Sequence, residues 1–242
     1  MRTDQNIHTK AMILAAGLGT RLRPLTNTIP KALVKVEGKT LLEMAIQHLA
    51  EYGVRDIIIN VHHFADQIIT YLAEHKNFGL TISISEEKEQ LLDTGGGLKK
   101  AAWFFGDEGP FFVRNVDVIS DLNLNALKEY HYSSKALASL VVRKRETSRY
   151  FLFDQEHRLC GWTNLKTGAK ILSAEPVGDT EMLGFSGIQM LNPEIFSLIK
   201  EEGSFSLTHL YLRLAKEQLI KGYLDTVSSW KDAGKPGLSE SV

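Results

Sequence analysis

The feature that most restricts the fold of this chain is a regular alternation of short apolar runs with helical patterns. Buried-strand patterns occupy residues 10–15, 55–61, 81–85 and 110–114, and helical patterns occupy 40–52, 64–76 and 97–105. The first helical pattern has clear ends, because Thr40 is a possible N-cap with Glu43 three residues on, and Gly53 is a stop signal. This alternation predicts an α/β fold, with a mostly parallel sheet flanked by helices.

The second half of the chain changes character, and no Pro/Gly/Ser-rich linker separates it from the first. Strands are predicted at 136–142, 184–191 and 222–227, a hairpin at 149–162 that turns at 154–157, and helices from Pro193 and from Ser206. We predict one domain over residues 10–242, with a first half at about 10–120 and a smaller lobe at about 121–235. Residues 1–9 are predicted to be a short flexible lead.

Composition excludes several classes of protein. The 242 residues carry a formal net charge of -1, so no overall basic field attracts nucleic acid. Cys160 is the single cysteine and cannot form an internal disulfide, and no apolar run reaches membrane-spanning length. We expect a cytoplasmic protein that binds neither nucleic acid nor membranes and is a monomer or a small homo-oligomer.

The loop after the first strand, LAAGLGTRLRPLTNTIPKAL at residues 14–33, has the composition of an anion-binding site. A dinucleotide fingerprint fails because Leu22 stands where its third glycine belongs, and because the second strand ends at residues 60–62 without an acid. A P-loop fails because Lys31 does not follow a glycine at the required spacing. The sequence therefore favours a third kind of phosphate site.

Glycines and basic residues are what this loop offers to a ligand. Gly17 and Gly19 let backbone N–H groups approach an anion, and Arg21, Arg23 and Lys31 add positive charge. Three basic residues are often no more than solvated surface charges. Their position around glycines at a strand end favours a triphosphate site instead, with Arg21 as a planar fork and Lys31 as a mobile charge.

These residues resemble the signature of the sugar 1-phosphate nucleotidylyltransferase family, roughly L-A-A-G-x-G-T-R-L-x-P-L-T followed by P-K-x-L. The similarity continues through GKTLLEMAIQHLAEYGVRDIIINVHH, the glycine run of DTGGG at 93–97, NVDV at 115–118 and WKDAG at 230–234. It therefore extends from Lys10 to Gly234. The resemblance implies a Rossmann-like nucleotidyltransferase fold with a small sugar-binding lobe. Among minimal relatives, the chain is most similar to the N-acetylmuramate 1-phosphate uridylyltransferases of cell-wall recycling.

The resemblance also implies a reaction and a set of residues. A sugar 1-phosphate attacks the α-phosphorus of a nucleoside triphosphate, UTP by preference, and pyrophosphate leaves in line. Arg21, Lys31 and Asp117 would be catalytic, and Mg²⁺ would be held by Asp117 and Asp232. The nucleotide would contact Ala15, Ala16, Gly17, Gly19, Thr20, Arg21, Lys31, Thr94, Gly95 and Asn115, and the sugar would contact Asn164, Ser186 and Gly187.

Some of these positions have ordinary structural alternatives. The glycines of DTGGG also suit a turn that precedes a helix, although Thr94 and Gly95 amides would allow close contact with a base. Asn164 stands where many relatives have an acid. A hairpin turn at Asn164 and a strand bulge at Ser186 and Gly187 would explain the three acceptor residues equally well.

The sequence departs from the family pattern beside both carboxylates. Val116 replaces the usual glycine before Asp117, and Ala233 and Lys235 replace the usual valine and threonine after Asp232. The chain ends soon afterwards, which predicts a minimal transferase. Two alternatives stay open at this point: the same chemistry on another sugar 1-phosphate or phosphocholine with another nucleotide, and a regulator that binds nucleotide sugars without turnover.

Overall fold

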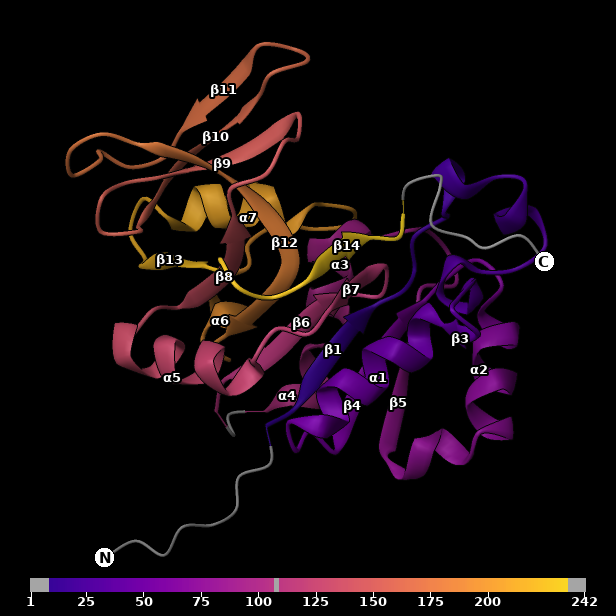
Figure 1. Cartoon of the computed structure of the whole chain (residues 1–242). Coiled ribbons are helices and arrows are strands. Elements are labelled where there is room, and N and C mark those ends of the chain that lie inside the picture. Colours follow the sequence, from indigo (N-terminus) through magenta and orange to yellow (C-terminus); the bar gives the residue numbers. More distant parts are fainter. Residues whose placement is uncertain (1–8, 107–108, 235–242) are drawn as a thin grey trace, which may run out of the picture.

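The computed structural model describes residues 9–106 and 109–234 and has a mixed central sheet with helices on both faces (Figure 1). The predicted lead falls on residues 1–8, which lie outside the described part, and on Thr9. The predicted α/β class is confirmed. Among the described residues, no helix is both long and apolar enough to cross a bilayer.

The first half contains the parallel part of the sheet, in the order β6-β1-β4-β5. Its pairs are all parallel, and the register aligns Leu14 with Asn60 and with Asn115 at the carboxyl ends of the strands. The strands are β1 (Ala11–Leu14), β4 (Asp56–Val61), β5 (Thr81–Glu86) and β6 (Phe111–Asn115). The helices and small elements between them are η1 (Thr20–Leu22), η2 (Leu25–Asn27), η3 (Lys31–Leu33), β2 (Lys35–Val36), β3 (Lys39–Thr40), α1 (Leu41–Glu51), α2 (Ala65–Glu74), η4 (Lys76–Gly79), α3 (Asp93–Lys100) and α4 (Ala102–Phe105).

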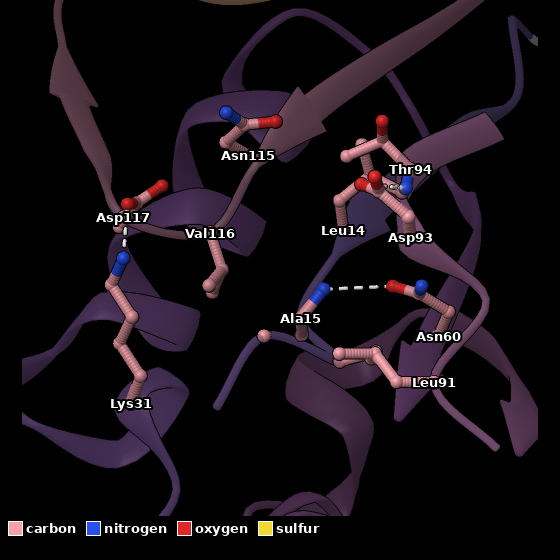
Figure 2. A pocket seen from close by; sticks show the side chains of 12 residues that line it. Leu14, Ala15, Lys31, Asn60, Leu91, Asp93, Thr94, Asn115, Val116 and Asp117 are labelled. Carbon is pink, nitrogen blue, oxygen red and sulfur yellow. Dashed lines mark hydrogen bonds and ion pairs between the residues drawn. The ribbon is translucent and has the colours of Figure 1, made fainter. Parts of the chain in front are cut away.

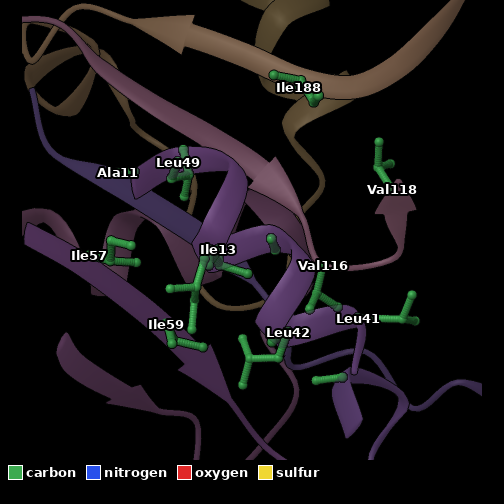
Figure 3. Close-up of a cluster of buried hydrophobic side chains, with 14 of the residues drawn as sticks. Ala11, Ile13, Leu41, Leu42, Leu49, Ile57, Ile59, Val116, Val118 and Ile188 are labelled. Atoms are coloured by element: carbon green, nitrogen blue, oxygen red, sulfur yellow. The ribbon is translucent and has the colours of Figure 1, made fainter. Parts of the chain in front are cut away.

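Alternating side chains of the strands build two separate cores. Ala11 and Ile13 of β1 face the cluster that contains α1, α2 and α5, whereas Met12 and Leu14 face the cluster that contains α3, α4, α6 and α7. Figure 3 shows the first cluster, in which Ile13 and Ile59 lie against Leu42 and Leu49 of α1. The apolar runs of the sequence are continuous because both faces of these strands are covered.

The second half extends the sheet with mainly antiparallel strands. β12 pairs with β9 near its amino end and with β6 near its carboxyl end, and β10 and β11 follow β9. β8 pairs with β12 between Gly184 and Leu191 and carries β13 in parallel. The elements are β7 (Val118–Ser120), α5 (Leu124–Ser134), β8 (Ala138–Arg143), β9 (Arg149–Phe153), β10 (Leu159–Asn164), β11 (Ala169–Leu172), β12 (Glu181–Leu191), α6 (Ile195–Leu198), α7 (Leu207–Leu214), β13 (Ile220–Leu224) and β14 (Trp230–Asp232).

Local sequence signals set several of these elements as predicted. Thr40 caps α1, since its Oγ1 accepts the Glu43 N–H at 3.0 Å. The predicted turn of the β9–β10 hairpin is held by Asp154, whose carboxylate accepts N–H groups from Glu156 and Arg158. The predicted last strand was misplaced: it lies at Ile220–Leu224 because it pairs in parallel with β8.

Candidate active site

Three neighbouring cavities follow the carboxyl edge of the parallel strands into the second lobe. The first has a volume of about 210 Å³ and lies where β1 and β6 end (Figure 2). It is lined by Leu14, Ala15, Ala16, Gly17, Lys31, Asn60, Leu91, Asp93, Thr94, Asn115, Val116 and Asp117. The edge is where ligands collect in open parallel sheets. The structure therefore brings together six of the predicted nucleotide-binding residues and one predicted metal ligand.

A buried amide anchors the start of the anion-binding loop. The Ala15 N–H donates to Asn60 Oδ1 at 2.8 Å (Figure 2), and Asn60 Nδ2 donates to Glu87 Oε1 at 2.7 Å. Asn60 and Glu87 are 2% and 1% exposed, so water does not compete for these bonds. The loop therefore leaves β1 in one fixed direction. Asn60 and Glu87 were not predicted as site residues.

Gly19 has a conformational reason to be glycine. Its φ is 63°, in the left-handed region, and a Cβ there would come within 3.0 Å of the side chains of Thr26 and Lys31. The Thr26 Oγ1 donates to the Gly19 carbonyl at 2.9 Å. Thr20 and Arg21 begin the short helix η1 directly after this turn and are exposed. Gly19 and Thr20 do not line the first cavity, whereas Arg21 lines the second.

One predicted metal ligand lies on a two-stranded ribbon and the other lies directly before it. β7 and β14 pair antiparallel with Asp232 opposite Val118, and the Ala233 N–H donates to the Asp117 carbonyl at 2.9 Å. This pairing brings Asp117 beside Asp232, although the two residues are far apart in the sequence. A Cβ on Gly234 would lie 2.5 Å from Lys31 Nζ, 2.6 Å from Asp117 Oδ2 and 2.9 Å from Arg21 Nη2. The structure therefore makes Gly234 a close-approach position.

Each carboxylate of this ribbon faces a cation. Lys31 Nζ forms an ion pair with Asp117 Oδ2, and these side chains are 11% and 15% exposed. Arg21 Nη1 lies 3.8 Å from Asp232 Oδ2 and is more exposed, at 58%. Two carboxylates at one point suit Mg²⁺, which completes its coordination with water and phosphate oxygens.

The glycine run of DTGGG corrects the sequence-based interpretation. It does not precede a helix: α3 begins at Asp93, so the glycines form its first turns. Cβ atoms on Gly95 and Gly96 would overlap Phe205 and the Gly203 carbonyl, and one on Gly97 would meet the Asn60 amide. These glycines therefore serve close packing. The helix predicted at 97–105 is also divided at Ala101 into α3 and α4.

The amides proposed to read the base have other partners. The Gly95 N–H donates to the Phe205 carbonyl at 2.8 Å, and the Thr94 N–H donates to Asp93 Oδ1 at 2.6 Å. The Thr94 Oγ1 accepts the Leu207 N–H at 2.9 Å. Thr94 thus lines the cavity while holding α7 in place. In this arrangement the Gly95 amide is not a donor for a nucleobase, because the packing of α3 on the segment before α7 uses it.

The second and third cavities form the wide part of the cleft. Their volumes are about 900 and 520 Å³, and they share Arg149, Phe151, Trp162, Asn164, Phe185 and Thr208. The third also shares Leu14, Asp93, Thr94 and Asn115 with the first cavity, which makes the three continuous. The second contains Arg21, Arg145, Arg149 and Lys166 but one carboxylate, that of Asp232. Its wall is therefore strongly basic.

Arg145 is held by Trp230 and Phe185. Its guanidinium carbon lies 4.5 Å from the centre of the Trp230 ring, and Nη2 donates to the Phe185 carbonyl at 2.9 Å. Its Nε is buried and has no hydrogen-bond partner among the described residues. Burial lowers the pKa of Arg145, and the Asp232 carboxylate acts in the opposite direction. The sequence signal that could have identified this wall is the basic run at 143–149, which sequence reasoning passed over.

The three predicted sugar-binding residues are not placed alike. Asn164 lines both wide cavities. Ser186 is 1% exposed, and its carbonyl accepts the Trp230 Nε1–H at 2.8 Å. Gly187 has a φ of 77°, and a Cβ there would meet Val118 and the Asn115 amide. β12 has a register shift between Phe185 and Gln189, so Ser186 and Gly187 lie in a bulge that supports Asn115 and β14.

Two solved structures have the same architecture as this chain. HddC from Yersinia pseudotuberculosis, complexed with GMP-PN, has a TM-score of 0.72 and 23% identity over 94% of this chain and 95% of that chain. A putative glucose-1-phosphate thymidylyltransferase from Bacillus anthracis has a TM-score of 0.76 and 20% identity over 94% and 91%. At these identities, the likeness confirms the predicted fold.

Sequence comparison then identifies the family. The nucleotidyl transferase family model matches residues 10–237. The N-acetylmuramate alpha-1-phosphate uridylyltransferase of Caulobacter vibrioides is 37% identical over 93% of this chain and 92% of its own length. The mannose-1-phosphate guanyltransferase 2 of Candida glabrata is 34% identical over 94% of this chain but 62% of its own length.

This chain belongs to the nucleotidyl transferase family. Its assignment to the sugar 1-phosphate nucleotidylyltransferases, predicted from the motifs around Arg21, Lys31 and Asp117, is confirmed.

Proposed function

We propose that the enzyme transfers uridylate from UTP to N-acetylmuramate 1-phosphate and releases pyrophosphate. The observation that carries this proposal is the basic wall of the acceptor cavity, formed by Arg145, Arg149 and Lys166 beyond the phosphate-binding Arg21. A muramate has a carboxylate on its sugar in addition to the phosphate. A second negative charge on the acceptor matches this excess of cations. The 37% identical relative from Caulobacter vibrioides supports the same substrates.

Residues of the first and second cavities would perform the transfer by holding charges in line. An oxygen of the acceptor phosphate forms a bond to the α-phosphorus while the bond from that phosphorus to the β-phosphate oxygen breaks, and both electrons leave with pyrophosphate. In this proposal, Arg21 would neutralise the departing pyrophosphate. Lys31, which is nearly buried beside Asp117, would bridge the α-phosphate and the incoming phosphate.

Asp117 and Asp232 fit a divalent cation by the chemistry of their donors. Carboxylate oxygens are the ligands that Mg²⁺ prefers. Asp232 ends β14 and Asp117 lies directly before β7, so the β7–β14 pairing holds the two residues side by side. When bound, the ion would neutralise charge that develops on the phosphates. The chain's own part is to orient the carboxylates: the Gly234 N–H donates to Asp232 Oδ1 at 3.0 Å, and Ala233 binds the Asp117 carbonyl.

The guanyltransferase relatives favour a second candidate, transfer of guanylate to mannose 1-phosphate. The two candidates differ in base and in acceptor charge. One assay separates them: the protein with Mg²⁺ is given each of five nucleoside triphosphates with N-acetylmuramate 1-phosphate, N-acetylglucosamine 1-phosphate or mannose 1-phosphate, and pyrophosphate is measured. We expect the highest kcat/KM for UTP with the muramate. A higher value for GTP with mannose 1-phosphate would replace our proposal with the second candidate.

Substitution of the basic wall tests the role of the acceptor carboxylate. The first two sugars of the assay differ by the carboxylate-bearing substituent, so their ratio of kcat/KM isolates it. We expect Arg149→Gln to lower that ratio about fivefold, which corresponds to one exposed ion pair. Lys170→Gln, on the exposed strand β11 and outside these cavities, is the matched control. An unchanged ratio in Arg149→Gln would contradict our interpretation of the wall.

The substrate assay also tests whether the protein is an active enzyme. If no pair of nucleotide and sugar phosphate releases pyrophosphate while the protein still binds nucleotide, a non-catalytic binding protein would be favoured.

A further inference from the structure

Behind the Asp117 turn lies a buried arginine that no family motif assigns. Arg114 stands in β6, three residues before Asp117, and is 2% exposed. The described residues place no carboxylate within ion-pair distance of it. Its guanidinium donates to the Val118 carbonyl at 2.5 Å through Nη2 and contacts His48 Nδ1 at 2.7 Å through Nη1. A buried cation without a paired carboxylate is costly, so its retention requires a reason.

The bond to Val118 closes the turn that carries Asp117. Arg114 and Val118 stand on either side of residues 115–117, and Val118 is the first residue of β7. The same turn supplies Asn115, Val116 and Asp117 to the first cavity. A donor that joins the two ends of so short a segment restricts the direction in which its side chains project. Figure 2 shows Asp117 and Val116 projecting from this turn at the cavity.

His48 of α1 fixes the arginine from the opposite side. Its Nε2 lies 2.9 Å from the Leu122 carbonyl, which accepts only from a protonated nitrogen. The Nδ1 atom is therefore the acceptor for the Arg114 Nη1–H. Burial and the Arg114 charge lower the pKa of His48 to about 4, which keeps this neutral form at physiological pH. The network connects α1 to the carbonyl of Val118, the first residue of β7, and to the carbonyl of Leu122, which follows that strand.

We propose that Arg114 is a positioning residue that holds the Asp117 turn in the geometry needed to bind a divalent cation together with the nucleotide. This inference rests on the proposed role of Asp117. The negative charge of Asp117 in turn partly offsets the positive charge of the buried Arg114 guanidinium. Arg114 thus acts on the reaction through Asp117 and touches neither substrate. Partners of this kind behind a metal ligand are typically worth tenfold to a hundredfold in affinity or activity.

Metal binding tests this proposal without turnover. Mn²⁺, a paramagnetic substitute for Mg²⁺, is titrated by electron paramagnetic resonance into the full chain with a non-hydrolysable UTP analogue. We expect Arg114→Met to weaken Mn²⁺ binding about tenfold and to lower kcat about a hundredfold, with little change in KM for UTP. Arg114→Lys should not restore either value, because a lysine cannot bind Val118 and His48 in the same planar geometry. Unchanged Mn²⁺ affinity in folded Arg114→Met would overturn the proposal.

Control variants separate positioning from general loss of stability. His131→Leu removes a buried histidine that bonds Ser139 of β8 and has no bond to the Asp117 turn among the described residues, so it should lower the melting temperature without changing Mn²⁺ affinity. If Arg114→Met does not fold, His48→Leu takes its place: it frees the guanidinium from one side and should weaken Mn²⁺ binding severalfold. Normal affinity in that variant would also refute the inference. If Asp117→Asn itself leaves Mn²⁺ binding intact, the metal assignment fails instead.

Discussion

The two halves of the cleft are built differently. At the nucleotide end, backbone groups and buried side chains fix the site: Ala15 is tied to Asn60, and Asp117 to Ala233 and the Arg114 network. At the acceptor end, Arg149 and Lys166 are exposed side chains around a cavity more than four times as large. The contrast indicates that the phosphate chemistry needs a rigid frame, whereas the choice of acceptor is left to side chains that can vary without disturbing it.

The largest effect should come from the rigid end. Asp117→Asn removes the charge that faces Lys31 and would hold the metal, at almost constant volume. We expect kcat in Mg²⁺ to fall roughly a thousandfold, whereas the free energy of unfolding falls by about 1–3 kcal/mol because Lys31 loses its carboxylate partner. Steady-state kinetics and urea denaturation of the same preparation measure both. Normal turnover in this variant would show that the rigid frame serves something other than the metal.

A second prediction compares two buried histidines, His48 beside the nucleotide end and His131 beneath β8. Burial is the main cause that lowers the pKa of each to about 4. The unfolded chain therefore binds more protons than the folded one between pH 6.5 and 4, so stability falls as the pH decreases through this range. Over this pH range, each buried histidine lowers the free energy of unfolding by up to roughly 3 kcal/mol.

The measurement is the free energy of unfolding from urea titrations at several pH values between 4 and 7. We expect His48→Gln and His131→Gln each to make the pH dependence shallower, whereas exposed His63→Gln should leave it as in the wild type. Equal slopes in all four proteins would mean that neither histidine is held neutral by burial.

A third prediction divides the loop between the two ends. Arg21 lines the wide cavity and faces Asp232, while Arg23 is exposed and lines none of the three cavities. Arg21→Gln should lower kcat about a hundredfold, because one donor to the departing pyrophosphate is lost. Arg23→Gln should stay within twofold of the wild type. An equal decrease of kcat in the two variants would mean that both arginines act only as general surface charges.

The sequence predicted more of the nucleotide end than of the acceptor end. The parallel strands, the cap at Thr40 and seven of the residues that line the first cavity follow from local patterns and from ordered motifs. For Ser186 and Gly187 the sequence left a contact with the sugar and a strand bulge as equal alternatives, and the structure places them in a bulge that supports Asn115 and Trp230. A residue that contacts a ligand and a residue that supports its neighbour both tolerate few different side chains. The position of a residue in a motif therefore does not tell the two roles apart.

By itself, the sequence determined the α/β alternation, the anion-binding loop and the identity of the charged groups, because each depends on near neighbours in the chain. Tertiary structure alone decided their partners. The β7–β14 pairing brings Asp232 beside Asp117. Asn60 of β4 donates to Glu87, which follows β5, and Arg114 of β6 donates to His48 of α1. These contacts depend on strand register and on which faces become buried, and such long-range packing has no signature in the local order of residues.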